Sequence, residues 1–205
     1  MNRPARLLVA TGNEGKLAEM RELLAATGIR VVAPREAGWN PDVPETGDTL
    51  EANALAKALA GAAATGLPTL ADDTGLFVDA LDGSPGVYSA RYAGPAQDPA
   101  ANCAKLLSDL SAVPADRRGA AFRCVVALAT PEGGTRLFTG EARGRIGRAP
   151  RGDSGFGYDP LFVCAETGRT FAEMSSVEKH RVSHRGRALA AVRDFLDALP
   201  DEEST

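Results

Sequence analysis

The opening stretch, "RLLVATGNEGKLAEM", constrains the possible folds of this chain more than any other feature. An apolar, β-prone run at residues 6–10 predicts a buried strand. From Gly15 onward apolar side chains recur at helical spacing, and Gly28 ends the predicted helix. Residues 29–33 predict a second strand, so the chain begins with a β-α-β unit of the kind found in parallel sheets.

The remaining patterns alternate between helix and strand. They predict a loop at 34–48, helices at 49–64 (capped by Asp48 or Thr49), 99–111 and 186–199, a strand within 67–81 that ends in a turn at Asp72 and Asp73, a hairpin of 120–130 and 134–146, and a short strand at 161–165. This alternation indicates an α/β fold with a mixed sheet. We expect one domain over residues 1–205, with two lobes, no clean linker and a charged tail.

Composition excludes several classes of protein. The net charge of −4 argues against a surface that coats nucleic acid, so any phosphate site should be a local basic pocket. The 3 cysteines are widely separated, which argues against a disulfide framework or a structural zinc site and suits a reducing cytosol. No apolar run approaches the ~18 residues of a membrane span, and the N-terminus is no signal peptide. We expect a cytoplasmic protein that binds neither membrane nor nucleic acid.

The corner after the first strand has the ingredients of an anion-binding turn but fits neither standard motif. A P-loop needs a glycine where Ala10 stands and a Mg²⁺-binding hydroxyl where Leu17 stands. The dinucleotide fingerprint fails too, because no third glycine follows Gly12 and Gly15 at its spacing. A helix N-terminus with glycines and Lys16 can still bind phosphate, and a plain turn with a solvated lysine is the alternative.

Carboxylates gather at two further places, Glu45 before a predicted helix and Asp72 with Asp73 after a predicted strand. Two acids at the end of a buried strand are costly unless their charge is compensated. Because successive strand residues point to opposite faces, the two aspartates should differ in role. Oxygen ligands from two loops suit Mg²⁺, whereas an Asx turn is the alternative. Next to a phosphate-binding corner, metal binding is favoured.

Two stretches near the end of the chain, "GDSGFGYDP" and "EKHRVSHRG", combine glycines, aromatic rings and cations. Phe156 could stack on a base, a contact worth roughly 1–3 kcal/mol. His180 and His184 have the helical spacing of a zinc pair, but no third ligand is evident nearby. A zinc site, a solvated basic helix end and a contact to an anion or base all stay open, and the last is favoured.

Six motifs in chain order resemble the inosine triphosphate pyrophosphatases, also called non-canonical purine NTP pyrophosphatases, over nearly the whole chain. They are "TGNEGK" at 11–16, "ETGDTLEANA" at 45–54, "ADDTGL" at 71–76, "GSPGVYSARYAG" at 83–94, "GFGYDP" at 155–160 and "SHRG" at 183–186. The resemblance implies an elongated mixed central sheet flanked by helices, two lobes with the active-site cleft between them, and a homodimer. It also implies Mg²⁺-dependent cleavage of ITP, dITP or XTP to monophosphate and pyrophosphate, which cleanses the nucleotide pool.

The resemblance also implies a role for each matched residue. Phosphates would be held by Thr11, Gly12, Asn13, Glu14, Gly15 and Lys16, and the base and sugar would be surrounded by Phe156, Gly157, Tyr158, Asp159, Lys179, His184 and Arg185. Glu45 and Asp73 would bind one or more Mg²⁺ ions per subunit, and Asp73 would accept the proton of the attacking water. Thr74 keeps a hydroxyl where many relatives have serine. Asp72 would support the metal site or a water.

Three other kinds of protein remain as alternatives. Related α/β pyrophosphatases act on dTTP or UTP, but the aromatic loop and "SHRG" argue against that group. A nucleotide-binding module without catalysis is disfavoured because Glu45 and Asp73 are retained. A protein that binds nucleic acid is disfavoured because the chain has no basic stripe.

Overall fold

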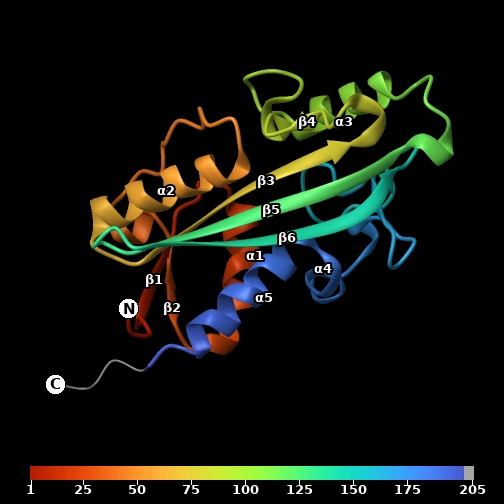
Figure 1. Ribbon diagram of the computed structural model, residues 1–205. Coiled ribbons are helices and arrows are strands. Elements are labelled where there is room, and N and C mark those ends of the chain that lie inside the picture. Colours follow the sequence, from red (N-terminus) through yellow and green to blue (C-terminus); the bar gives the residue numbers. More distant parts are fainter. Residues whose placement is uncertain (201–205) are drawn as a thin grey trace. The chain divides into compact units, whose positions relative to one another are not determined.

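A computed structural model describes residues 1–200 and shows the α/β class expected from the sequence, a mixed central sheet flanked by helices (Figure 1). Within these residues the sheet has 7 strands in the order β2-β1-β3-β5-β6-β7, with β4 paired to β3. The strands are β1 (Arg6–Val9), β2 (Arg30–Val32), β3 (Thr69–Val78), β4 (Pro85–Gly86), β5 (Gly119–Ala129), β6 (Thr135–Ile146) and β7 (Phe162–Cys164). The helices are α1 (Glu14–Leu24), α2 (Leu50–Thr65), α3 (Pro99–Asp109), α4 (Ser176–Val182) and α5 (His184–Asp197). The charged tail expected beyond residue 200 lies outside the described residues.

The chain divides into two compact units. The first unit comprises Met1–Asp73, Val125–Thr139 and the chain from Arg187 onward, and the second comprises Thr74–Cys124 and Gly140–Gly186. Strands β3, β5 and β6 each contribute residues to both units, so the chain passes between them without a linker segment. One domain over residues 1–205 stays a prediction.

The first unit begins with the β-α-β unit expected from the opening sequence. Strand β1 pairs in parallel with β2 and with β3, so Leu8 lies opposite Val32 on one side and Thr69 on the other. Strand β1 lies between β2 and β3, so the crossover from β1 to β2 and the crossover from β2 to β3 run in opposite directions across the sheet. Because both crossovers are right-handed, α1 and α2 lie on opposite faces. Figure 1 shows α2 on one face of these strands and α1 with α5 on the other.

The second unit has a core of its own, built around a group of aromatic rings. Phe122, Phe162 and Phe171 pack with ring centroids 4.8 to 5.9 Å apart. Strand β7 pairs antiparallel with β6, and β4 pairs antiparallel with β3. This aromatic core supports the loop 155–160 and helix α4, which carry several of the expected site residues.

Two local predictions are wrong. No turn interrupts the acidic pair, because β3 continues from Thr69 to Val78 and both aspartates are buried within it. Each aspartate has a lysine partner, which supplies the compensation that a buried carboxylate needs. The last helix begins at His184 rather than at Gly186. The hairpin prediction agrees with the structure, where β5 and β6 are sheet neighbours and Thr130 N–H donates to Gly134 O at 2.9 Å.

Candidate functional site

Three buried or half-buried polar groups of the first unit gather around Lys57 of α2. The Lys57 Nζ atom lies 2.5 Å from Glu45 Oε1 and 3.4 Å from Asp73 Oδ1. Asn53, one turn earlier in α2, donates from Nδ2 to Asp73 Oδ2 at 3.1 Å. Residue 45 belongs to the loop before α2 and Asp73 to β3, so α2 joins two acids that are distant in sequence.

Asp72 points the other way and meets a different lysine. Its Oδ2 lies 3.1 Å from Lys16 Nζ in α1, and the Asp72 side chain is fully buried. The alternation of side chains along a strand explains why consecutive aspartates contact helices on opposite faces of the sheet. The expectation that the two acids differ in role therefore has a structural basis, with Asp73 beside Glu45 and Asp72 beside the corner at Lys16.

The pKa shifts in this cluster follow from burial and from the charges of the neighbouring groups. Burial by itself lowers the pKa of Lys57, but the charges of Asp73, Asp72 and Glu45 outweigh it and the net pKa is raised. Burial raises the pKa of Asp73, which the charges of Lys57 and Lys16 offset only in part. Lys57 therefore stays protonated, and Asp73 holds a proton more readily than a solvated aspartate does.

The residues present fit a divalent cation. A single ammonium nitrogen lies within bonding distance of both Glu45 and Asp73, so the two carboxylates already converge on the space of one cation. In this part of the first unit Glu45 and Asp73 pair with Lys57, and Asp72 pairs with Lys16. Within residues 1–200 no three His, Cys, Asp or Glu side chains form a metal-binding group. Mg²⁺ commonly takes one or two carboxylates and completes its shell with water and substrate phosphates, so this donor set suits it.

The corner at Thr11–Lys16 forms the capped start of α1. Asn13 is the N-cap, and its Oδ1 accepts the Lys16 backbone N–H at 3.0 Å. Thr11 Oγ1 accepts the Asn13 N–H at 3.1 Å. These two bonds hold the turn in shape. The helix dipole and the Lys16 ammonium both favour a negatively charged ligand near this end of α1.

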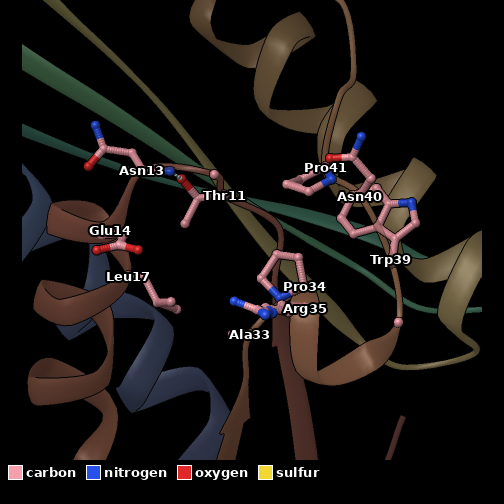
Figure 2. A pocket seen from close by; sticks show the side chains of 12 residues that line it. Thr11, Asn13, Glu14, Leu17, Ala33, Pro34, Arg35, Trp39, Asn40 and Pro41 are labelled. Carbon is pink, nitrogen blue, oxygen red and sulfur yellow. Dashed lines mark hydrogen bonds between the residues drawn. The ribbon is translucent and has the colours of Figure 1, made fainter.

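A hollow of about 500 Å³ opens beside this corner (Figure 2). One wall is Thr11–Glu14 with Leu17, and the other is Ala33–Arg35 with Gly38–Pro41. Figure 2 shows the Trp39 and Asn40 side chains on the side away from α1. The lining includes none of Lys16, Glu45 and Asp73, so the hollow and the carboxylate cluster are separate features of the first unit.

In the second unit the expected base-binding residues cluster around Phe156 and Asp159. Lys179 Nζ lies 2.7 Å from Asp159 Oδ2, with both side chains buried. The same oxygen accepts the Phe156 N–H at 2.9 Å, and this bond joins the two ends of the turn at residues 156–159. Lys179 Nζ also lies 5.0 Å from the centroid of the half-buried Phe156 ring, within cation–π range.

His184 and Arg185 occupy the first turn of α5 and are buried, so the alternative of a solvated basic helix end is wrong. The His184 ring stacks on Phe122 with centroids 4.6 Å apart and an interplanar angle of 14°. Arg185 Nη2 donates to Thr74 Oγ1 at 3.2 Å, and its Cζ lies 5.6 Å from the Phe156 centroid. His180 lies in α4, so the two histidines do not share a helix as a zinc pair would require.

Tyr158 has a different place from its neighbours in the aromatic loop. Its ring belongs to the hydrophobic core, and its hydroxyl donates to Ser89 O at 2.8 Å. Gly157, beside it, has a positive φ of 61° and its carbonyl accepts from Cys103 Sγ at 3.4 Å. Tyr158 therefore anchors the loop, while Phe156 and the backbone of Gly157 remain the parts that a ligand can contact.

Comparisons with known proteins identify the family of the chain. A model of the Ham1 family matches residues 7–195. The chain belongs to the Ham1 family. A relative of this Ham1-family chain from Geobacter sulfurreducens, named dITP/XTP pyrophosphatase, is 53% identical over 191 residues, which are 93% of this chain and 96% of the relative. The solved structure of a HAM1 protein from Coxiella burnetii has a TM-score of 0.84 at 42% identity and covers 94% of this chain and 98% of its own. The solved structure of a Nucleoside-triphosphatase / dITP/XTP pyrophosphatase from Mycobacterium abscessus has a TM-score of 0.73 at 50% identity, and the match covers 91% of this chain and 98% of that chain.

The sequence interpretation of this Ham1-family chain missed two residues of the site, Asn53 and Lys57. Both lie inside or just after a motif that was noted, "ETGDTLEANA", and they stand four residues apart on α2. A signal was available, since an asparagine and a lysine at helical spacing share a face with Ala54, Ala58 and Gly61. Polar residues on a helix face that otherwise carries small apolar residues indicate that the polar residues have buried partners.

Among residues 1–200 the structure contains no helix with the length and apolar character of a membrane span.

Proposed function

We propose that this chain hydrolyses non-canonical purine nucleoside triphosphates of the ITP, dITP and XTP type to the monophosphate and pyrophosphate. The proposal carries over the activity named in its relatives, which match it over nearly their full length. The observation that supports it most directly is the convergence of Glu45 and Asp73 on the ammonium of Lys57, which brings two carboxylates within reach of one cation. Removal of deaminated purines from the nucleotide pool, a homodimeric state and a cytoplasmic location are further parts of this proposal.

The chemistry follows from the charge of the substrate. Water attacks the α-phosphorus, the bond from that phosphorus to the α–β bridging oxygen breaks, and pyrophosphate leaves with the bonding pair. Glu45 and Asp73 would hold Mg²⁺, which supplies neutralisation of the polyphosphate charge. Lys16 and the free N–H groups at the start of α1 supply more of it. Asp73, with a pKa raised by burial, would orient the water and accept its proton.

The second-unit cluster is assigned to the base. The half-buried Phe156 ring offers a face for stacking, and Arg185 and His184 offer donors to the oxygen at C6 of hypoxanthine or xanthine. Adenine carries an amino donor at that position, and a mismatched buried donor pair costs about 1–3 kcal/mol per group. Thr74, which Arg185 contacts, follows Asp73 directly in β3.

The test is pyrophosphate release from a panel of nucleotides, ITP, dITP, XTP, GTP, ATP and dTTP, each with Mg²⁺ and with a chelator. We expect release from the first three, several-fold or more above ATP and dTTP, and none with the chelator. Preferred hydrolysis of dTTP would indicate instead a pyrophosphatase that acts on pyrimidine nucleotides such as dTTP or UTP. Tight ITP binding without release would make it a binding module, and either result would end the proposal.

A further inference from the structure

A buried asparagine at the start of α2, Asn53, lies between the loop that carries Glu45 and the strand that carries Asp73. Only 2% of its surface is exposed. It stands four residues after the N-cap Thr49, where its own backbone N–H donates to Thr49 O at 3.2 Å. Its backbone is therefore fixed by the helix, and the amide group is free to serve two other parts of the chain.

The two ends of the Asn53 amide serve different partners. Its Oδ1 accepts the Gly47 N–H at 2.8 Å, and its Nδ2 donates to Asp73 Oδ2 at 3.1 Å. Because a backbone N–H can only donate, the oxygen must face Gly47 and the NH₂ group must face the carboxylate. The network thus fixes the amide orientation. An aspartate of the same shape could serve Gly47 but could not donate to Asp73.

Lys57 and Asn53 divide the carboxylate of Asp73 between them. Lys57 approaches Oδ1 and Asn53 holds Oδ2, and each of them also contacts the loop before α2, at Glu45 and Gly47 respectively. The loop has no room for adjustment at this point. A Cβ at Gly47 would lie 2.7 Å from Asn53 Oδ1 and 2.8 Å from the Ala52 Cβ. Only glycine permits this approach.

We propose that Asn53 is a positioning residue for the reaction. It fixes the orientation of the Asp73 carboxylate through Oδ2, while Lys57 contacts Oδ1, and it holds the Glu45 loop at the same time through Gly47. This inference rests on the proposed function. A displacement of a catalytic group of about 1 Å can cost on the order of 10²-fold in rate, so loss of the Asn53 bond to Oδ2 should reduce turnover without removing a substrate contact.

The chain supplies a matched control in Asn102. This asparagine also stands four residues after an N-cap, Asp98 of α3, and is 4% exposed. Its Oδ1 accepts the Ala93 N–H at 2.6 Å and its Nδ2 donates to Ala90 O at 2.9 Å. Both residues tie a helix start to other chain segments through two bonds, but only Asn53 reaches a carboxylate. Asn102→Ala therefore measures the structural cost alone.

The experiment compares Asn53→Ala, Asn53→Asp and Asn102→Ala in the full chain. Steady-state pyrophosphate release from ITP gives kcat and KM, thermal unfolding gives Tm, and hydrogen exchange reports the Gly47 amide. We expect both Asn53 variants to lose kcat by roughly 10- to 100-fold with KM within about threefold. Asn102→Ala should lower Tm and leave kcat within about twofold. The Gly47 amide should exchange faster in Asn53→Ala and stay protected in Asn53→Asp, which keeps the acceptor.

The outcomes separate this inference from the function on which it rests. Asn53 variants with kcat within about twofold of the natural chain would overturn it, as would an equal loss of kcat in Asn102→Ala. If Asn53→Ala does not fold, Asn53→Asp decides the kinetic comparison. If the natural chain releases pyrophosphate from no nucleotide, the proposed function fails and the catalytic role of Asn53 falls with it. Exchange at Gly47 then still reports whether the loop is held as described.

Discussion

Each unit contains one buried helical lysine bonded to buried acid, and the surroundings of the two lysines differ. Lys57 in α2 faces Glu45 and Asp73 directly and feels the charge of Asp72. Lys179 in α4 lies 2.7 Å from the Asp159 carboxylate and over the rings of Phe156 and Phe171. The first arrangement gathers carboxylates from two chain segments around a lysine, which suits the binding of a cation. The second packs an ion pair against aromatic rings, which suits a flat ligand.

The comparison predicts that neutralising the acid partner of each lysine affects different kinetic constants, kcat in the first unit and KM in the second, and this is the largest effect that we expect. Asp73→Asn should lower kcat for ITP by roughly 10²- to 10⁴-fold, because it removes the group that we propose to orient the water and accept its proton. Binding of ITP, measured by calorimetry, should change far less. Asp159→Asn should mainly raise KM. Near-normal turnover in Asp73→Asn would remove Asp73 from the mechanism.

Removal of each lysine should show, through the free energy of unfolding, how the carboxylates around that lysine affect stability. Breaking a buried ion pair typically costs about 3–5 kcal/mol, so Lys57→Met and Lys179→Met should both lower the free energy of unfolding by about that much. Lys57→Met leaves several carboxylates close together, and their pKa values rise in the folded state. The folded state then binds more protons than the unfolded one, so its stability falls as the pH rises.

The measurement is urea unfolding with a chelator at pH 5 and pH 8. We expect Lys57→Met to lose more stability between these two values than Lys179→Met, which removes the ion-pair partner of Asp159. An equal pH dependence in the two variants would mean that the gathering of carboxylates around Lys57 has no energetic consequence.

Base reading should depend on Arg185, the buried cation next to Phe156 in the second unit. Arg185→Ala should reduce the preference for ITP over ATP by roughly 5- to 150-fold, the equivalent of about 1–3 kcal/mol. The comparison of kcat/KM for the two nucleotides measures this change. Arg181→Ala, at an exposed position of α4, is the control and should keep the preference. An unchanged preference in Arg185→Ala would refute our assignment of the base contacts.

The smallest effect concerns the start of α4, the helix that carries Lys179. Glu178 forms a capping box with Ser175, and its pKa is lowered from 4.5 to about 2 by the hydrogen bond from Arg169 and by the bonds from Ser175. A carboxylate with a lowered pKa stabilises the fold above its unfolded pKa and loses that contribution as the pH falls toward about 2. Glu178→Gln should therefore lower Tm slightly at pH 7, and the difference from the natural chain should vanish near pH 2. A difference that persists there would assign the effect to packing.

The regular elements of this fold could be predicted from the sequence because their signals are local. The apolar run at 6–10, the caps of α2 and the glycines of the hairpin turn all act within a few residues. The failure at Asp72 and Asp73 has a non-local cause. The two acids can lie within this buried strand because Lys16 and Lys57 from other elements pair with them. The sequence near residue 72 carries no signal that predicts these two partners.

The candidate site also has a part that could be predicted from the sequence and a part that depends on contacts between distant residues. The motif residues Lys16, Glu45 and Asp73 were named from the resemblance, and the structure brings Glu45 and Asp73 together. For His184 and Arg185 the sequence favoured a contact to an anion or base and left a solvated basic helix end open as an alternative. Their burial depends on the Phe122 ring and on Thr74, both distant in the chain.

The alternation of side chains along β3 has a consequence for how this protein can change over evolutionary time. Asp72 meets Lys16 on one face and Asp73 meets Lys57 on the other, so the two acids depend on a fixed count of residues from the pairing of Leu70 with Val9. One residue gained or lost between Leu70 and Asp72 would exchange the faces and separate both acids from their partners. Insertions should accordingly accumulate in the loop 34–48 and be absent from this stretch of strand.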